Sequence, residues 1–118
     1  MKISEVKEYC KSFRGVIGVV EGDPSNILVY KVGDKKFAYF KTSEPEKWRF
    51  SIRVSSSRFL ELTDQTGIKP ARYMHRFHWI TIVQTSSVDS SYLKELIQWS
   101  YNKALTTLSK KAQKEIME

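Results

Sequence analysis

A strict alternation of apolar and polar side chains runs through residues 47–54. The apolar positions are Trp48, Phe50, Ile52 and Val54, and the positions between them are Lys47, Arg49, Ser51 and Arg53. Because successive side chains of a strand point to opposite faces, this period of two predicts a strand with one buried and one solvated face. Strands of this kind are typical of antiparallel sheets, in which only one face is covered.

Two further runs rich in branched and aromatic residues, 27–32 and 36–41, flank Gly33 and Asp34. A glycine at the first position of a two-residue loop supplies the positive φ that a tight hairpin requires, so we expect a β-hairpin here. Residues 16–20 and 78–84 are additional candidate strands. Residues 68–70 are expected to be extended, because the residue before a proline avoids the helical region.

Helices are predicted by apolar residues at three- and four-residue spacing. They occupy residues 3–14, 57–63, 90–108 and 110–117, with Ser55–Ser57, Asp89 or Ser90, and Ser109 as candidate N-caps. Strands that come in runs, rather than alternating singly with helices, favour an α+β fold. We therefore expect a mainly antiparallel sheet with helices packed on one face, in the order α-β(3)-α-β(2)-α. The 118 residues are expected to form a single domain, 1–118.

The composition narrows the class of protein. No apolar run approaches the roughly 18 residues of a membrane span, and the first residues form no continuous hydrophobic block. Cys10 is the single cysteine, so no internal disulfide can form, and we expect a cytoplasmic protein without a membrane partner. The formal net charge of +7 suggests a polyanionic partner.

Signals for enzymatic chemistry are weak. The sequence has no glycine-rich nucleotide loop and no zinc-protease motif, so we expect no enzyme and no cofactor. Cys10 lies on the apolar stripe of its helix, as a buried hydrophobe would, rather than beside a histidine base. His75 and His78 are three residues apart without a convincing third ligand, and we expect no metal site.

Positive charge is concentrated in one stretch of the chain. Residues 31–58 hold eight Lys and Arg against three Asp and Glu, which is five of the seven net charges. Alternate residues on a strand stand about 6.6 Å apart, close to the phosphate repeat along a nucleic-acid strand. The cations of the predicted third strand could therefore follow a phosphate backbone.

Three segments, in this order, resemble one family. They are Tyr30–Ala38, with its glycine turn, Pro70–Trp79, which ends in His-Trp, and the last long helix with Ser100, Tyr101, Ala104 and Leu108. This pattern is similar to the MmcQ/YjbR family. The resemblance implies an α+β fold like that of secretion chaperones and the frataxin-type sheet. It also implies a DNA-binding function in which wing-like hairpins contact the DNA.

Charge and resemblance together lead us to expect weak, non-specific binding of nucleic acid, with duplex DNA as the expected partner. The expected contact residues are Lys35, Lys36, Lys47, Arg49, Arg53, Arg72, Arg76, His78 and Trp79. In this interpretation the cations hold phosphates and Trp79 offers a stacking surface.

An alternative interpretation gives the same cations a different role. Lysines at turns and arginines on an outer sheet face also maintain solubility. The chain would then be a protein-interaction adaptor that binds a protein partner through a sheet edge or an apolar face. Ile27 and Val29 project opposite to Leu28, Tyr30 and Val32, so this interpretation expects an exposed apolar pair on that strand.

Overall fold

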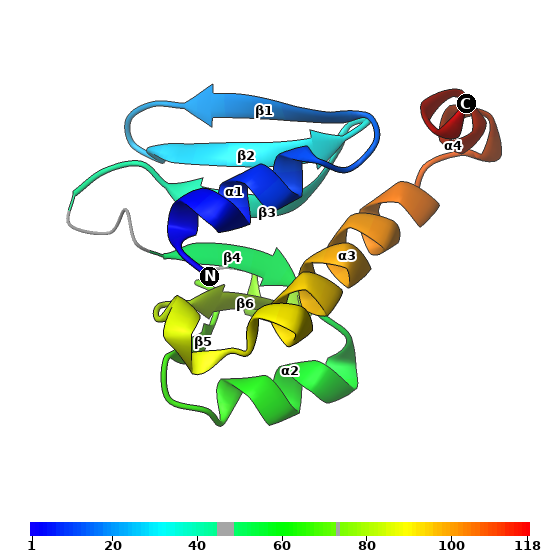
Figure 1. Ribbon diagram of the computed structural model, residues 1–118. Coiled ribbons are helices and arrows are strands. Elements are labelled where there is room, and N and C mark those ends of the chain that lie inside the picture. Colours follow the sequence, from blue (N-terminus) through cyan, green and yellow to red (C-terminus); the bar gives the residue numbers. More distant parts are fainter. Residues whose placement is uncertain (45–48, 73) are drawn as a thin grey trace.

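Six strands form one antiparallel sheet in the order β1-β2-β3-β4-β6-β5 (Figure 1). The structure is a computed structural model and describes residues 1–44, 49–72 and 74–118. The strands are β1 (Val16–Glu21), β2 (Ile27–Val32), β3 (Lys35–Lys41), β4 (Phe50–Arg53), β5 (Ile68–Pro70) and β6 (Trp79–Ile82). The helices are α1 (Ile3–Lys11), α2 (Ser56–Thr63), α3 (Ser90–Thr106) and α4 (Lys110–Met117), with short 3-10 turns η1 (His75–Phe77) and η2 (Thr85–Ser87).

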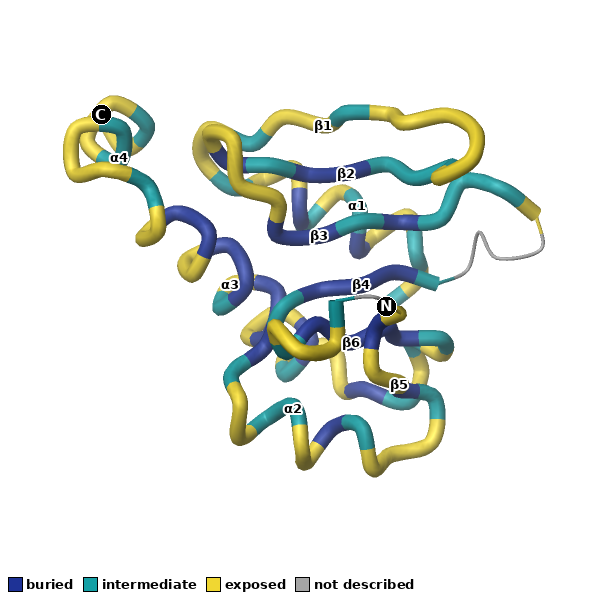
Figure 2. Tube along the Cα trace, turned by 180° about the vertical axis from the view of Figure 1, so that it is seen from behind, coloured by how far each residue is buried: buried dark blue, intermediate teal, exposed yellow. Residues whose placement is uncertain are grey.

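The helices leave one face of the sheet uncovered. In Figure 1, α1 and α3 cross the near face of the sheet, while α2 packs at the β5–β6 end. The core lies between this face and the helices, where Phe40, Ile52 and Ile80 from three neighbouring strands meet Leu93 and Ile97 of α3. Figure 2 views the opposite face, which we call the open face.

The predicted fold class is confirmed. The candidate strand at 16–20 is β1, a complete edge strand paired along its length with β2, so four strands rather than the three of the expected order precede α2. The strand predicted from the alternation is β4, and its apolar residues Phe50 and Ile52 are buried, as is Val54 after it. Ser51, on the face predicted to be solvated, is also buried (2% exposed). Lys47 and Trp48, which belong to the same pattern, lie outside the described residues.

The candidate N-caps are confirmed. Ser55 Oγ accepts a hydrogen bond from the Arg58 amide (3.4 Å), and Ser109 Oγ accepts one from the Ala112 amide (3.1 Å). At the start of α3, Asp89 accepts from the Ser91 amide (3.1 Å), and hydrogen bonds from Ser91 lower the pKa of the Asp89 carboxyl. Within the described residues, α3 is the longest helix, and none of the helices there could cross a membrane.

The β2–β3 hairpin turns at Gly33, as predicted. Its φ of +60° is in the left-handed region, and a Cβ there would stand 2.9 Å from a methyl carbon of Leu108. The hairpin contains a register shift between Tyr30 and Lys31. Such an irregularity lets two consecutive residues, Phe37 and Ala38, both be buried, which strict alternation does not predict.

Ser100 of α3 connects two strands through one buried hydroxyl. Its Oγ–H donates to the Phe37 carbonyl of β3 (2.6 Å), and the same oxygen accepts from the Arg53 amide of β4 (3.1 Å). Ser100 is 1% exposed, so water cannot replace these bonds. The hydroxyl therefore fixes α3 against the end of the sheet where Arg53 is held.

We predict that Ser100→Ala lowers the free energy of unfolding by about 2–3 kcal/mol, because it leaves the Phe37 carbonyl and the Arg53 amide unpaired in the interior. Urea denaturation followed by circular dichroism measures this. Ser86→Ala, in the exposed part of η2, is the matched control and is expected to leave stability within about 0.5 kcal/mol of the parent. Equal stabilities for the two variants would contradict the role given to Ser100.

Candidate nucleic-acid interface

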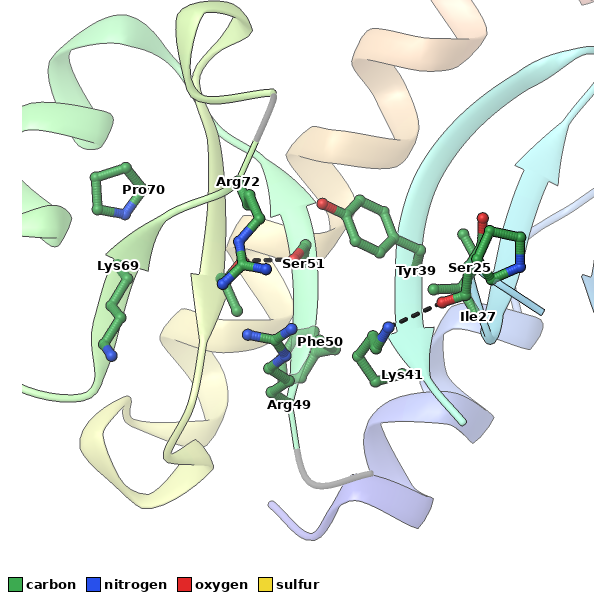
Figure 3. A pocket seen from close by; sticks show the side chains of 12 residues that line it. Ser25, Ile27, Tyr39, Lys41, Arg49, Phe50, Ser51, Lys69, Pro70 and Arg72 are labelled. Atoms are coloured by element: carbon green, nitrogen blue, oxygen red, sulfur yellow. Dashed lines mark hydrogen bonds between the residues drawn. The ribbon is translucent and has the colours of Figure 1, made fainter. Parts of the chain in front are cut away.

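A cleft of about 590 Å³ lies on the open face between β3 and the β5–β6 pair. We call it the central cleft. Tyr39, Ser51 and Thr81 come from three adjacent strands and line it, because each occupies the register position that points away from the helices. Figure 3 shows these strands and the side chains around the cleft.

Four cationic side chains line the central cleft. They come from four segments: Lys41 ends β3, Arg49 directly precedes β4, Lys69 lies in β5, and Arg72 follows β5. Lys41 Nζ donates to the Ser25 carbonyl (2.8 Å), which fixes that ammonium at one wall. Figure 3 shows the guanidinium groups of Arg49 and Arg72 directed into the same space. No Asp or Glu lies among the described residues that line this cleft.

Two hydroxyls lie at the base of the central cleft. Ser51 Oγ and Thr81 Oγ1 are 2.7 Å apart and share one hydrogen bond across the β4–β6 pair. Because two hydroxyls carry two protons and this bond uses one, the pair keeps a proton to donate. A base of hydroxyls surrounded by cations is suited to an anion such as a phosphate.

A second cleft of about 370 Å³ lies between the β2–β3 turn, the end of β4, η1 and α3. We call it the hairpin cleft. Its charged lining is Lys31, Asp34, Lys35, Lys36 and Arg53, and its large apolar lining residues are Met74, Phe77 and Trp79. Cationic residues therefore outnumber acidic ones in this cleft as well. Here, however, aromatic rings lie beside the cations.

The structure divides the predicted contact residues between the two clefts. The central cleft contains Arg49 and Arg72, and the hairpin cleft contains Lys35, Lys36, Arg53 and Trp79. Arg76 is exposed on η1, and its guanidinium lies over the Phe77 ring at 5.0 Å from the centroid. Lys47 lies outside the described residues.

The expectation that Trp79 offers a stacking surface is wrong for this structure. Trp79 is 3% exposed, because side chains of β3 and the η1 turn pack around it on the open side of the sheet. Its ring packs against Tyr39, with 5.5 Å between centroids, and Lys36 Nζ lies 5.8 Å from the Trp79 centroid. Trp79 therefore has no free face for a base.

His78 also differs from the expectation. It takes the left-handed conformation (φ +66°) that ends η1, and its half-buried ring packs edge-on against Phe59 of α2 at 5.6 Å. This contact turns His78 toward α2 and away from the clefts. His75 is exposed, and no metal-binding group of three His, Cys, Asp or Glu occurs within residues 1–44, 49–72 and 74–118.

Sequence reasoning missed several residues of the interface. Lys69 and Thr81 were not singled out, because only the β5–β6 pairing brings them beside β4. Ser51 could have been recognised, since it alternates with Phe50 and Ile52 on a strand predicted to be half-buried. Phe77 could not be recognised as a surface residue from the sequence, because no repeating pattern of apolar residues predicts the 3-10 turn η1 in which it lies.

The exposed apolar pair expected on β2 is not present. Val29 is 1% exposed and Ile27 is half-buried beside the central cleft. The exposed apolar side chains of this region lie on β1 instead, where Ile17 and Val20 are 55% and 72% exposed. The adaptor interpretation therefore loses the β2 pair, while its other candidate surface, a sheet edge, is β1 with Ile17 and Val20.

Comparison with known proteins identifies the family. The sequence matches the YjbR family model over residues 12–103. The chain belongs to the YjbR family. The uncharacterised protein YjbR of Escherichia coli (strain K12) is 28% identical over 119 aligned positions, which span 100% of this chain and 99% of that protein. YbdF of Escherichia coli O157:H7 is 31% identical over 91 positions, 75% of this chain and 72% of its own.

Solved structures share the YjbR-family fold described above. A Deinococcus radiodurans protein with the domain DUF419 superposes with a TM-score of 0.83 at 23% identity, covering 98% of this chain and 87% of its own. A Pseudomonas syringae protein superposes with a TM-score of 0.70 at 18% identity, covering 88% of this chain and 99% of its own. The family match confirms the resemblance that was based on the hairpin, the His-Trp segment and the last long helix.

Cys10 lies in the core of this fold, as its place on the helical stripe predicted. It is 0% exposed, and burial raises the pKa of its thiol to about 12. A thiol that stays protonated at neutral pH is a poor nucleophile. The side chain therefore contributes packing between α1 and the sheet.

We predict that Cys10 makes the protein less stable at alkaline pH. The folded thiol keeps its proton, while the unfolded thiol loses its proton above its pKa of about 8.5, so the unfolding free energy falls as pH rises past that value. From about pH 9 to about pH 11 this contributes a loss of about 2 kcal/mol. Urea titrations of the parent and of Cys10→Ala compare the two pH slopes, and equal slopes would contradict the assignment.

Proposed function

We propose that this protein binds nucleic acid by holding the phosphate backbone across its open face, without reading the base sequence. The observation that carries the proposal is the convergence of Lys41, Arg49, Lys69 and Arg72 on the central cleft. Lys41 and Arg49 lie at neighbouring ends of β3 and β4, Lys69 and Arg72 lie in and just after β5, and only the folded sheet brings these two pairs together. Cations confined to one edge of the sheet would be explained equally well by a role in keeping the protein soluble.

The two clefts form one path along β4. Arg49 continues the β3–β4 pairing, because the Lys41 amide donates to its carbonyl (3.4 Å), and Arg53 ends the strand in the hairpin cleft. Four residues of strand separate these two arginines by about 13 Å. A backbone that enters at the central cleft can therefore reach the hairpin cleft by following a single strand.

The chemistry of both clefts fits phosphate groups. Arginine donates two parallel N–H groups to phosphate oxygens, lysine adds a point charge, and the Ser51–Thr81 pair can donate a further hydrogen bond. Contacts of this kind position a polymer but do not distinguish bases. The function implied by the resemblance to the MmcQ/YjbR family is of the same class.

We predict that affinity for duplex DNA falls steeply with salt. If about five phosphates are neutralised, log affinity plotted against log salt has a slope of about −4.5. The measurement is fluorescence anisotropy of a labelled duplex from about 25 to about 300 mM salt. The double variant Lys69→Gln/Arg72→Gln is expected to bind every sequence more weakly and to flatten the slope by about 2.

Lys110→Gln/Lys111→Gln is the matched control, because it removes the same charge from exposed positions of α4. It is expected to keep the parent slope. A control variant that behaves like Lys69→Gln/Arg72→Gln would show that net charge, rather than the cleft, determines binding. Absence of binding at the lowest salt would contradict the proposal and favour the protein-interaction adaptor.

A further inference from the structure

Phe77 is exposed at the rim of the hairpin cleft, although phenylalanine is normally buried. It is 46% exposed and lines the cleft next to Met74 and Trp79. Its main chain is held in place, because its carbonyl accepts from Arg53 Nε (3.1 Å) and its amide donates to the Met74 carbonyl (3.1 Å). The fold therefore keeps an aromatic ring at the surface on a fixed turn.

Cationic groups lie around this ring. The Arg76 guanidinium lies over it at 5.0 Å, as in an arginine–aromatic stack, and covers one side. Lys31, Lys35 and Lys36 line the same cleft as the ring. A ring with cations nearby is the arrangement that binds single-stranded nucleic acid, in which aromatic side chains stack on bases and cations hold the adjoining phosphates.

Arg53 connects this ring to the proposed phosphate path. Its Nε bonds to the Phe77 carbonyl, while its amide bonds to Ser100 of α3 (3.1 Å). The arginine at the end of β4 is therefore fixed next to the ring. A backbone that follows β4 from the central cleft reaches Phe77 about two phosphate repeats further on.

We propose that Phe77 is a stacking platform for an unpaired nucleobase, so that the protein prefers single-stranded to duplex nucleic acid. The inference rests on the proposed function and adds the class of substrate. A duplex offers its phosphates to the open face but keeps its bases paired and stacked inside. Only a single strand has free bases. It alone can place phosphates in the central cleft and stack a base on Phe77 in the hairpin cleft at the same time.

The experiment uses two labelled probes with equal charge. One is a single-stranded DNA of about twelve nucleotides, and the other has the same backbone with abasic sites throughout, so that only the bases differ. By anisotropy at about 25 mM salt, the parent is expected to bind the probe with bases at least about five-fold more tightly. Phe77→Ala is expected to bring this ratio close to one without weakening binding to the abasic probe, and Phe77→Trp is expected to keep the ratio.

The two probes separate the two proposals. Failure to bind the abasic probe would overturn the phosphate path of the proposed function. Binding of both probes with equal affinity, or an unchanged ratio in Phe77→Ala, would overturn the stacking site alone and assign the exposed ring to another contact, such as a protein partner. Because Phe77 is nearly half exposed, Phe77→Ala is expected to fold, and circular dichroism checks this.

Discussion

The one-sided packing of helices on the sheet determines the rest of this structure. The core lies between the sheet and α1, α2 and α3, so every strand residue that points the other way faces the open side. On that side the sheet presents hydroxyls, cations and the Tyr39 ring where a second layer would need apolar side chains. The candidate interface is therefore a consequence of an asymmetric core.

The sequence predicted the individual helices, strands and turns more accurately than it predicted which of them lie side by side in the folded sheet. Hairpin turn, caps and alternation are local signals, and Gly33, Ser109 and Ile52 each appear in the structure as expected. Pairing between β5 and β6 depends on the whole fold, so Lys69 could not be placed beside Arg49 from spacing alone. Trp79 was misread for the same reason, because only the folded sheet brings the Tyr39 ring and Lys36 of β3 against it.

In the proposals made above, the two clefts recognise nucleic acid in two different ways. Cations and hydroxyls in the central cleft suit a phosphate, whereas the hairpin cleft adds an exposed ring next to lysines. Arg53 lines the hairpin cleft at the end of β4 and bonds to the Phe77 carbonyl, and β4 runs from there to the central cleft. If both proposals hold, β4 aligns a strand so that its backbone and one base are held together.

The most direct test of the central claim is a map of the surface that nucleic acid touches. Amide chemical shifts of the ¹⁵N-labelled protein, followed by NMR during titration with single-stranded DNA, report this residue by residue. The account predicts the largest shifts at Lys41, Ser51, Lys69 and Thr81, with α1 and α4 little changed. Shifts confined to the helices, with the open face unaffected, would contradict it.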